Sequence, residues 1–245
     1  MAKVLIVEND SITANNFIQM FKIYDEFDVD VVGQLSEAKK LLANQRYEFG
    51  VADLEIGNEE NGETIALFNK CNVSPIVFTN KIDEEFIEAF ESANIVDYIV
   101  KSRYRSTNNV VDKLRQLIYN KKTKILIISN TQTYSNYLKQ NLEIHNFQVL
   151  IAKNSQESLE KLKLHEDMDL VITEYDLPYV NGLELVKKIR KTRSKLDLNI
   201  LVLVEETNSY LTSCFLNEDA NDFLVKQFSR DALYSRVYQN VPLIV

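Results

Sequence analysis

The chain has 245 residues, of which 45% are hydrophobic and 26% are charged, a balance that is typical of a folded globular protein and excludes a disordered chain. Its formal net charge of −8 argues against direct binding to nucleic acid, because phosphate backbones are bound by positive surfaces. The two cysteines, Cys71 and Cys214, lie outside any disulfide framework or metal-ligand spacing, which favours a reducing, cytoplasmic location. No apolar run has the length of a membrane span.

The predicted elements follow one another in a regular alternation. Short apolar runs without alternating polarity predict strands that are covered on both faces, at residues 4–7, 76–78, 125–128 and 200–204. Apolar residues at helical spacing predict helices around residues 37–42, 65–68, 86–90, 110–118 and 156–164, with Ser36 and Ser155 as the N-caps of the first and the last. Strands and helices that alternate in this way predict an α/β fold with a doubly wound parallel sheet.

The chain also repeats itself, at an offset of 121 residues that grows to 125 near its end. Residues 3–9 return as 124–130, residues 49–53 as 170–174, and residues 96–101 as 221–226. A repeat of this length is a duplicated domain, because solenoid units are much shorter. We therefore predict two domains, 1–120 and 123–245, joined by a short basic stretch.

Polar side chains follow the predicted strands of the first half. Glu8 and Asn9 come after the first strand, Asp53 after the third, Thr79 after the fourth and Lys101 after the fifth. Ligands of doubly wound sheets bind at the carboxyl ends of the strands, so these side chains are expected at one edge. Oxygen ligands of this kind suit Mg²⁺, and a carboxylate beside such an ion can attack a phosphoryl group.

In these residues the sequence resembles the receiver domain of two-component response regulators, and the resemblance covers nearly the whole chain, twice. It implies a flavodoxin-like sheet of order 2-1-3-4-5 in each half. It also implies Mg²⁺-dependent transfer of a phosphoryl group to Asp53 from a histidine kinase or a phosphotransfer protein. By this resemblance the metal ligands are Glu8, Asn9, Asp53 and Glu55, the phosphoryl-binding residues are Thr79 and Lys101, and the switch aromatic is Tyr98.

Two of these roles have alternatives. Asn9 stands where the family has a metal-binding acid, so weaker metal binding and less repulsion between carboxylates are expected. Tyr98 can equally be an ordinary core residue, because aromatic side chains on central strands often are.

The second half departs further from the family pattern. Its counterparts of the site residues are Ser129, Asn130, Glu174, Val204 and Lys226. Without an acid pair or a hydroxyl, this half is expected to be a pseudo-receiver in which Glu174 pairs permanently with Lys226. Alternatively, that pair is exposed and contributes little.

The spacing of these positions is the strongest part of the resemblance. Asn9 and Asp53 are 44 residues apart, as are Asn130 and Glu174, and 22 residues separate Lys101 from Thr79 and Lys226 from Val204. The two histidines, His145 and His165, are expected at the surface, and neither is expected to carry a phosphoryl group.

The sequence therefore predicts a cytoplasmic regulatory phosphoacceptor that is not itself an enzyme, that has no membrane or nucleic-acid partner, and that could form a homodimer. Two alternatives stay open. The chain could be the regulatory part of an output enzyme such as a diguanylate cyclase, an inference from family analogy alone. It could also be an interaction scaffold that works without phosphorylation, which Asn9 favours.

Overall fold

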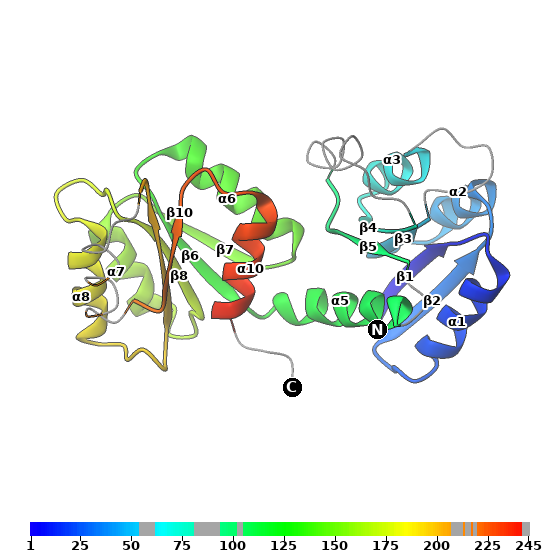
Figure 1. Cartoon of the computed structure of the whole chain (residues 1–245), viewed down its shortest axis with the longest axis horizontal. Coiled ribbons are helices and arrows are strands. Elements are labelled where there is room, and N and C mark those ends of the chain that lie inside the picture. Colours follow the sequence, from blue (N-terminus) through cyan, green and yellow to red (C-terminus); the bar gives the residue numbers. More distant parts are fainter. Residues whose placement is uncertain are drawn as a thin grey trace. The chain divides into compact units, whose positions relative to one another are not determined.

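The computed structural model describes residues 1–53, 62–80, 94–101, 105–206, 213, 217 and 220–241. The chain divides into two compact units, Met1–Ile118 and Tyr119–Val245. Each unit holds one five-stranded sheet with helices packed on both faces (Figure 1). The helix predicted around residues 86–90 lies outside the described residues.

The first unit alternates strands and helices as predicted. Its elements are β1 (Ala2–Val7), α1 (Ser11–Phe21), β2 (Phe27–Val32), α2 (Leu35–Asn44), β3 (Phe49–Ala52), α3 (Glu63–Lys70), β4 (Ser74–Thr79), β5 (Asp97–Val100) and α5 (Ser106–Asn120). The strands pair in parallel in the order β2-β1-β3-β4-β5. Close packing of α3 on this sheet needs Gly50, because a Cβ at that position would clash with the Phe68 ring.

The second unit repeats the arrangement. Its elements are β6 (Lys124–Ile128), α6 (Gln132–Ile144), β7 (Gln148–Ala152), α7 (Ser155–Leu164), β8 (Leu170–Glu174), α8 (Gly182–Arg190), β9 (Asn199–Val204), β10 (Asp222–Val225) and α10 (Arg230–Asn240). The strands pair in parallel in the order β7-β6-β8-β9-β10. The predicted order 2-1-3-4-5 and the α/β class are therefore confirmed in both units.

The two faces of each sheet carry separate cores. In the second unit, one core joins the sheet to α7 and α8, and the other joins it to α6 and α10. In the first unit, α2 and α3 share one core with β1 and β4. Consecutive strand residues, whose side chains point to opposite faces of the sheet, are fully buried, as expected of parallel strands covered on both faces.

Three local predictions were wrong. Gln34, not Ser36, is the N-cap of α2, and Ser36 lies inside the helix. Asn154, not Ser155, caps α7, because its side chain accepts a hydrogen bond from Glu157 N at 2.9 Å. His145 is only 1% exposed, because α10 covers the end of α6: its ring stacks on Tyr234 with 3.8 Å between centroids.

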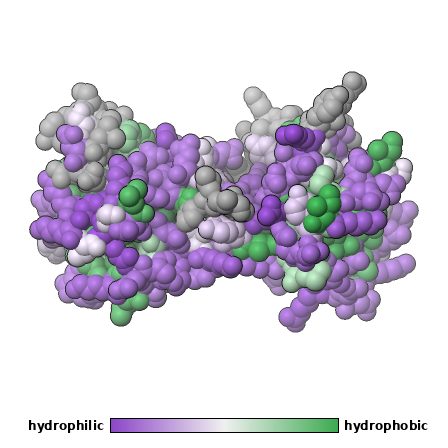
Figure 2. All heavy atoms as spheres, turned by 90° about the horizontal axis from the view of Figure 1, so that it is seen from below, coloured by the Kyte–Doolittle hydropathy of each residue, from purple (hydrophilic) through white to green (hydrophobic). Residues whose placement is uncertain are grey.

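The surface is mainly hydrophilic over the face seen in Figure 2, with scattered apolar residues. The apolar side chains that are at least 70% exposed in the described part of the chain are spread over different segments: Met1, Ile12, Ile23, Leu164, Tyr179 and Leu196. Isolated exposed apolar residues are normal and mark no docking site. None of the described helices is long and apolar enough to cross a membrane.

Candidate functional site

The site of the first unit is built on two buried carboxylates that share one ammonium group. Glu8 follows β1 and Asp53 follows β3, and these residues are 2% and 4% exposed. The Lys101 Nζ, which follows β5, lies 2.7 Å from Glu8 Oε2 and 2.7 Å from Asp53 Oδ2. Because β1 and β3 are neighbours in the sheet, their carboxyl ends bring the two acids together at one edge.

Backbone contacts hold Glu8 in this position. Its Oε1 accepts a hydrogen bond from Asp10 N at 2.9 Å, while Oε2 faces Lys101. Asp10 in turn is the N-cap of α1 and accepts from Thr13 N at 2.8 Å. This hydrogen bond lowers the pKa of Asp10, whereas burial raises the pKa of Glu8 despite the nearby ammonium group.

Lys101 is fixed from three directions. Its backbone N donates to Thr79 O at 2.8 Å, which ties the end of β5 to the end of β4. Its Nζ lies 5.2 Å from the centre of the Phe78 ring, within the range of a cation–π contact. Burial acts to lower the pKa of Lys101, but the hydrogen bonds and charges of Asp53 and Glu8 outweigh it, so the pKa is raised.

The other predicted residues of this site have different surroundings. Thr79 is fully buried at the end of β4, Asn9 is exposed, and Tyr98 is half-buried against the core cluster shared by α2 and α3. The proposed ligand Glu55 lies outside the described residues. Tyr98 therefore touches the core, as the simpler interpretation requires, and its partial exposure is also compatible with a switch.

The donor set fits a hard divalent cation in its chemistry. Among the residues that the structure describes, no group of three or more His, Cys, Asp or Glu side chains is assembled as a metal site. The two buried carboxylates nevertheless carry more negative charge than the single ammonium of Lys101 compensates. Carboxylate and amide oxygens, as in Glu8, Asp53 and Asn9, are ligands that Mg²⁺ accepts.

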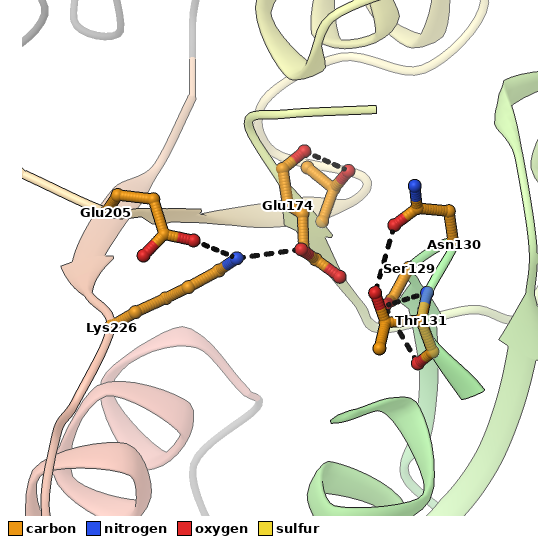
Figure 3. Close-up of polar contacts among 7 residues, drawn as sticks. Ser129, Asn130, Thr131, Glu174, Glu205 and Lys226 are labelled. Atoms are coloured by element: carbon orange, nitrogen blue, oxygen red, sulfur yellow. Dashed lines mark hydrogen bonds and ion pairs between the residues drawn. The ribbon is translucent and has the colours of Figure 1, made fainter. Parts of the chain in front are cut away.

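The second unit surrounds its lysine differently (Figure 3). Lys226 follows β10, and its Nζ lies 2.8 Å from Glu174 Oε2 and 2.7 Å from Glu205 Oε1. Glu174 is 5% exposed, whereas the Glu205 side chain is 61% exposed. The pair with Glu174 is therefore a buried contact and not a solvated one. Burial alone would lower the pKa of Lys226, but the hydrogen bonds that its ammonium donates to both carboxylates raise it.

The second unit has Ser129 where the first has Glu8, so it lacks the acid after its first strand but keeps the turn that this residue forms. Ser129 Oγ accepts a hydrogen bond from Thr131 N at 3.1 Å and donates to Thr131 O at 3.3 Å. Glu8 makes the matching contact with the backbone two residues on. Asn130 Oδ1 accepts from the Thr131 hydroxyl, and Val204 is buried where a hydroxyl would stand. Ser129 thus keeps the turn without the charge.

Sequence reasoning missed two residues at this site. Glu205 was not among the residues predicted for this site, yet it is the second carboxylate on Lys226. Tyr134, from the first turn of α6, places its ring 5.2 Å from Lys226 Nζ. The only available signal was position: Glu205 directly follows the fourth strand of its sheet, at the same edge as Lys226.

Comparison with known proteins agrees with this geometry. The family model of the response regulator receiver domain matches residues 125–238. Two solved structures of two-component response regulator/GGDEF domain proteins match over 98% of this chain and 98% of theirs, with TM-scores of 0.86 and 0.85 and 26% and 25% identity. The chain consists of two receiver domains in tandem. We call them the first and the second receiver.

Curated relatives match one part of the chain. Response regulator ArlR of Staphylococcus saprophyticus is 30% identical over 115 residues, which are 47% of this chain and 50% of that protein. ArlR of Staphylococcus aureus strain Mu50 is 31% identical over 115 residues, 47% of this chain and 51% of that protein. The chain thus spans about half the length of the curated relatives that it matches.

Proposed function

We propose that the first receiver accepts a phosphoryl group on Asp53 from a histidine kinase or a phosphotransfer protein. The observation that carries this proposal is the pair of buried carboxylates, Glu8 and Asp53, held on one ammonium at the carboxyl edge of the sheet. Receiver domains belong to two-component systems, which supports such a partner.

In the proposed reaction, an Asp53 carboxylate oxygen attacks the phosphorus of a phosphohistidine. A P–O bond to Asp53 forms, the P–N bond breaks, and the imidazole nitrogen keeps the electron pair and takes a proton from water. The Lys101 ammonium, already 2.7 Å from Asp53, would move onto a phosphoryl oxygen and compensate its charge. Thr79 would supply a hydroxyl donor at the neighbouring strand end.

Glu8, Asp53 and Asn9 would hold Mg²⁺, with the carbonyl of Glu55 as a further ligand by family resemblance. When bound, the ion supplies compensation for the negative charge that gathers around the transferred group. The amide of Asn9 contributes an oxygen but no charge, so this receiver is expected to bind Mg²⁺ more weakly than one with an acid there.

We further propose that the second receiver is fixed in one state and does not accept a phosphoryl group. Lys226 is held by a buried carboxylate and by Glu205. Ser129 provides no acid after the first strand, and Val204 provides no hydroxyl at the end of the fourth. The role of the second receiver would be regulation or dimerisation, while only the first receiver changes its phosphorylation state.

The two structures matched over nearly their whole length are named as response regulator/GGDEF domain proteins. This observation favours a second candidate, in which the tandem receivers regulate an enzymatic output domain such as a diguanylate cyclase. The two candidates are compatible, because phosphorylation of Asp53 would be the input in both.

Beryllofluoride with Mg²⁺, a mimic of a phosphorylated aspartate, tests the proposal. The chain should bind it at one site by ¹⁹F NMR, Asp53→Asn should abolish this binding, and Glu174→Gln should leave it unchanged. Absence of binding to the wild-type chain would instead support a scaffold that works without phosphorylation. Labelling of Glu174 by acetyl phosphate would contradict the fixed state of the second receiver.

A further inference from the structure

The second receiver has a cavity at the edge of its sheet where a phosphoryl group would otherwise bind. It has a volume of about 520 Å³ and is lined by residues from the start of α6 and from the ends of β8, β9 and β10. This volume lies within the range of small-molecule pockets, roughly 300–1,000 Å³. The residues that matter for its chemistry are Thr131, Tyr134, Tyr137, Glu174, Glu205 and Lys226.

The polar groups of the cavity have an excess of negative charge. Glu174 and Glu205 contribute two carboxylates, and Lys226 is the one cation among the lining residues that the structure describes. Lys226 uses one oxygen of each carboxylate. A phosphoryl group or another anion would therefore meet net repulsion, whereas a monovalent cation would neutralise the site.

A second observation points to a ligand that donates hydrogen bonds. Glu174 Oε1 is buried and has no hydrogen-bond partner among the described residues. It points to the side of the site where Ser129 and Thr131 lie (Figure 3), and Thr131 is part of the cavity wall. The hydroxyl of Tyr134 is likewise buried without a described partner. Buried polar groups without a partner are costly, so a ligand that donates to these oxygens is favoured.

The walls of the cavity suit a flat organic cation. The rings of Tyr134 and Tyr137 lie 6.4 Å apart at 20°, so one helix presents two nearly parallel aromatic faces. Tyr134 already accepts the Lys226 ammonium on its ring at 5.2 Å. Aromatic faces beside carboxylates are the combination that binds ammonium and guanidinium groups.

We propose that the second receiver binds a small organic cation, a primary ammonium or an amidinium/guanidinium group on an apolar body, with Glu174 Oε1 as its main acceptor. The ligand would take the place that a phosphoryl group has in an active receiver and would make the second receiver a sensor of a diffusible compound. This inference does not depend on phosphorylation of Asp53, and each can fail without the other.

Isothermal titration of the full chain with benzamidinium chloride tests the proposal, because this probe is flat, cationic and rich in donors. Neutral benzamide and anionic benzoate have nearly the same shape and serve as matched ligands. Benzamidinium should bind in the millimolar range or tighter, and at least roughly tenfold more tightly than benzamide, a difference of about 1.4 kcal/mol. No binding of benzamidinium, or equal binding of benzamide, would overturn the proposal.

Variants locate the site. Glu174→Gln keeps the volume and removes the charge, and it should weaken benzamidinium binding by roughly tenfold or more. Tyr137→Ala, at a residue that is 41% exposed and therefore tolerant of change, should weaken it several-fold. Glu206→Gln, at an exposed residue that follows Glu205 and does not line the cavity, and Asp53→Asn, in the first receiver, should bind as the wild-type chain does. Loss of binding in Asp53→Asn, with Glu174→Gln unaffected, would place the ligand in the first receiver and refute the assignment.

Discussion

The two receivers keep the same lysine and surround it with different carboxylates. Lys101 contacts Glu8 and Asp53, which are both buried, while Lys226 contacts the buried Glu174 and the largely exposed Glu205. In the first receiver the second acid follows the first strand, and in the second receiver it follows the fourth. Both receivers thus keep two carboxylates on the lysine, but the second has lost the acid that follows the first strand.

The sheet order explains why this shift matters. Strand β8 lies between β6 and β9, so an acid after β6 and an acid after β9 approach Glu174 from opposite sides. Glu205 draws Lys226 toward the β9 side, and Ser129 on the β6 side is engaged with its own turn. Both lysines thus contact two carboxylates, but only in the first receiver are both of these carboxylates buried.

Removal of each lysine should change the free energy of unfolding more than any other substitution, and by different amounts in the two receivers. Lys101→Met leaves two buried carboxylates without compensation and should lower the free energy of unfolding of the first receiver by about 3–5 kcal/mol. Lys226→Met leaves only Glu174 buried, since Glu205 is exposed, and should cost the second receiver about 1–3 kcal/mol.

Hydrogen exchange of peptides from each receiver, measured at increasing urea, separates the two effects. Mg²⁺ should restore stability to Lys101→Met and not to Lys226→Met. Equal losses in the two variants, or rescue of both, would show that the two sites have the same electrostatics.

Gly182→Ala tests whether the backbone around Glu174 can give way. A Cβ at residue 182 would lie 2.6 Å from Glu174 O and 2.9 Å from Tyr175 Cα, both of which are backbone atoms. We expect a loss of about 1–3 kcal/mol in the second receiver. Gly33→Ala in the first receiver is the control, because its nearest neighbour would be Glu8 O at 4.0 Å, and it should be neutral in urea denaturation. A neutral Gly182→Ala would mean that the Glu174 loop adapts.

The stability of the two receivers should depend on pH in different ways, because Ser129, the counterpart of Glu8 in the second receiver, does not titrate. Burial raises the pKa of Glu8 above its ordinary value of 4.5. A raised carboxyl pKa favours the protonated folded state, so this contribution to stability is complete below pH 4.5 and is lost as pH rises through the folded pKa.

Urea denaturation at a series of pH values from 4.5 upward should show that the first receiver of Glu8→Gln does not lose this contribution to stability as the pH rises. Its amide oxygen can still accept from Asp10 N. An unchanged pH profile in Glu8→Gln would contradict the raised pKa, and Ser129→Ala should leave the profile of the second receiver unchanged.

The family resemblance was sufficient for the sheet order. The apolar runs were sufficient for the strand-end positions of Glu8, Asp53 and Glu174, because they mark buried strands whose last or next residue must lie at the edge of the sheet. It did not predict Glu205, whose role depends on which way Lys226 extends. It also placed His145 at the surface, although Tyr238, 93 residues away, meets its Nδ1 at 2.6 Å. Contacts of this range arise from tertiary packing, and local spacing carries no signal for them.

Asn9→Asp should have a smaller effect on stability, and it should increase the difference in Mg²⁺ affinity between the two receivers. A third acid in the first receiver should tighten Mg²⁺ and speed phosphorylation by acetyl phosphate. It should lower metal-free stability by no more than about 1 kcal/mol, because residue 9 is exposed. Thermal melting during Mg²⁺ titration measures both effects. Asn130→Asp is the matched control and should not create Mg²⁺ binding, and unchanged affinity in Asn9→Asp would contradict the ligand role of this residue.

Glu205→Gln should have the smallest effect. The Glu205 side chain is 61% exposed, so its ion pair with Lys226 should contribute about 0–1 kcal/mol. The pKa of Lys226, followed through its Nζ resonance by NMR, should fall but remain raised, because Glu174 still contacts the ammonium at 2.8 Å. Glu174→Gln should lower this pKa further, since it removes the buried charge. If the two variants lowered the pKa equally, the buried carboxylate would hold Lys226 no more strongly than the exposed one. The proposed contrast between a phosphorylatable and a fixed receiver would then rest on Ser129 and Val204 alone.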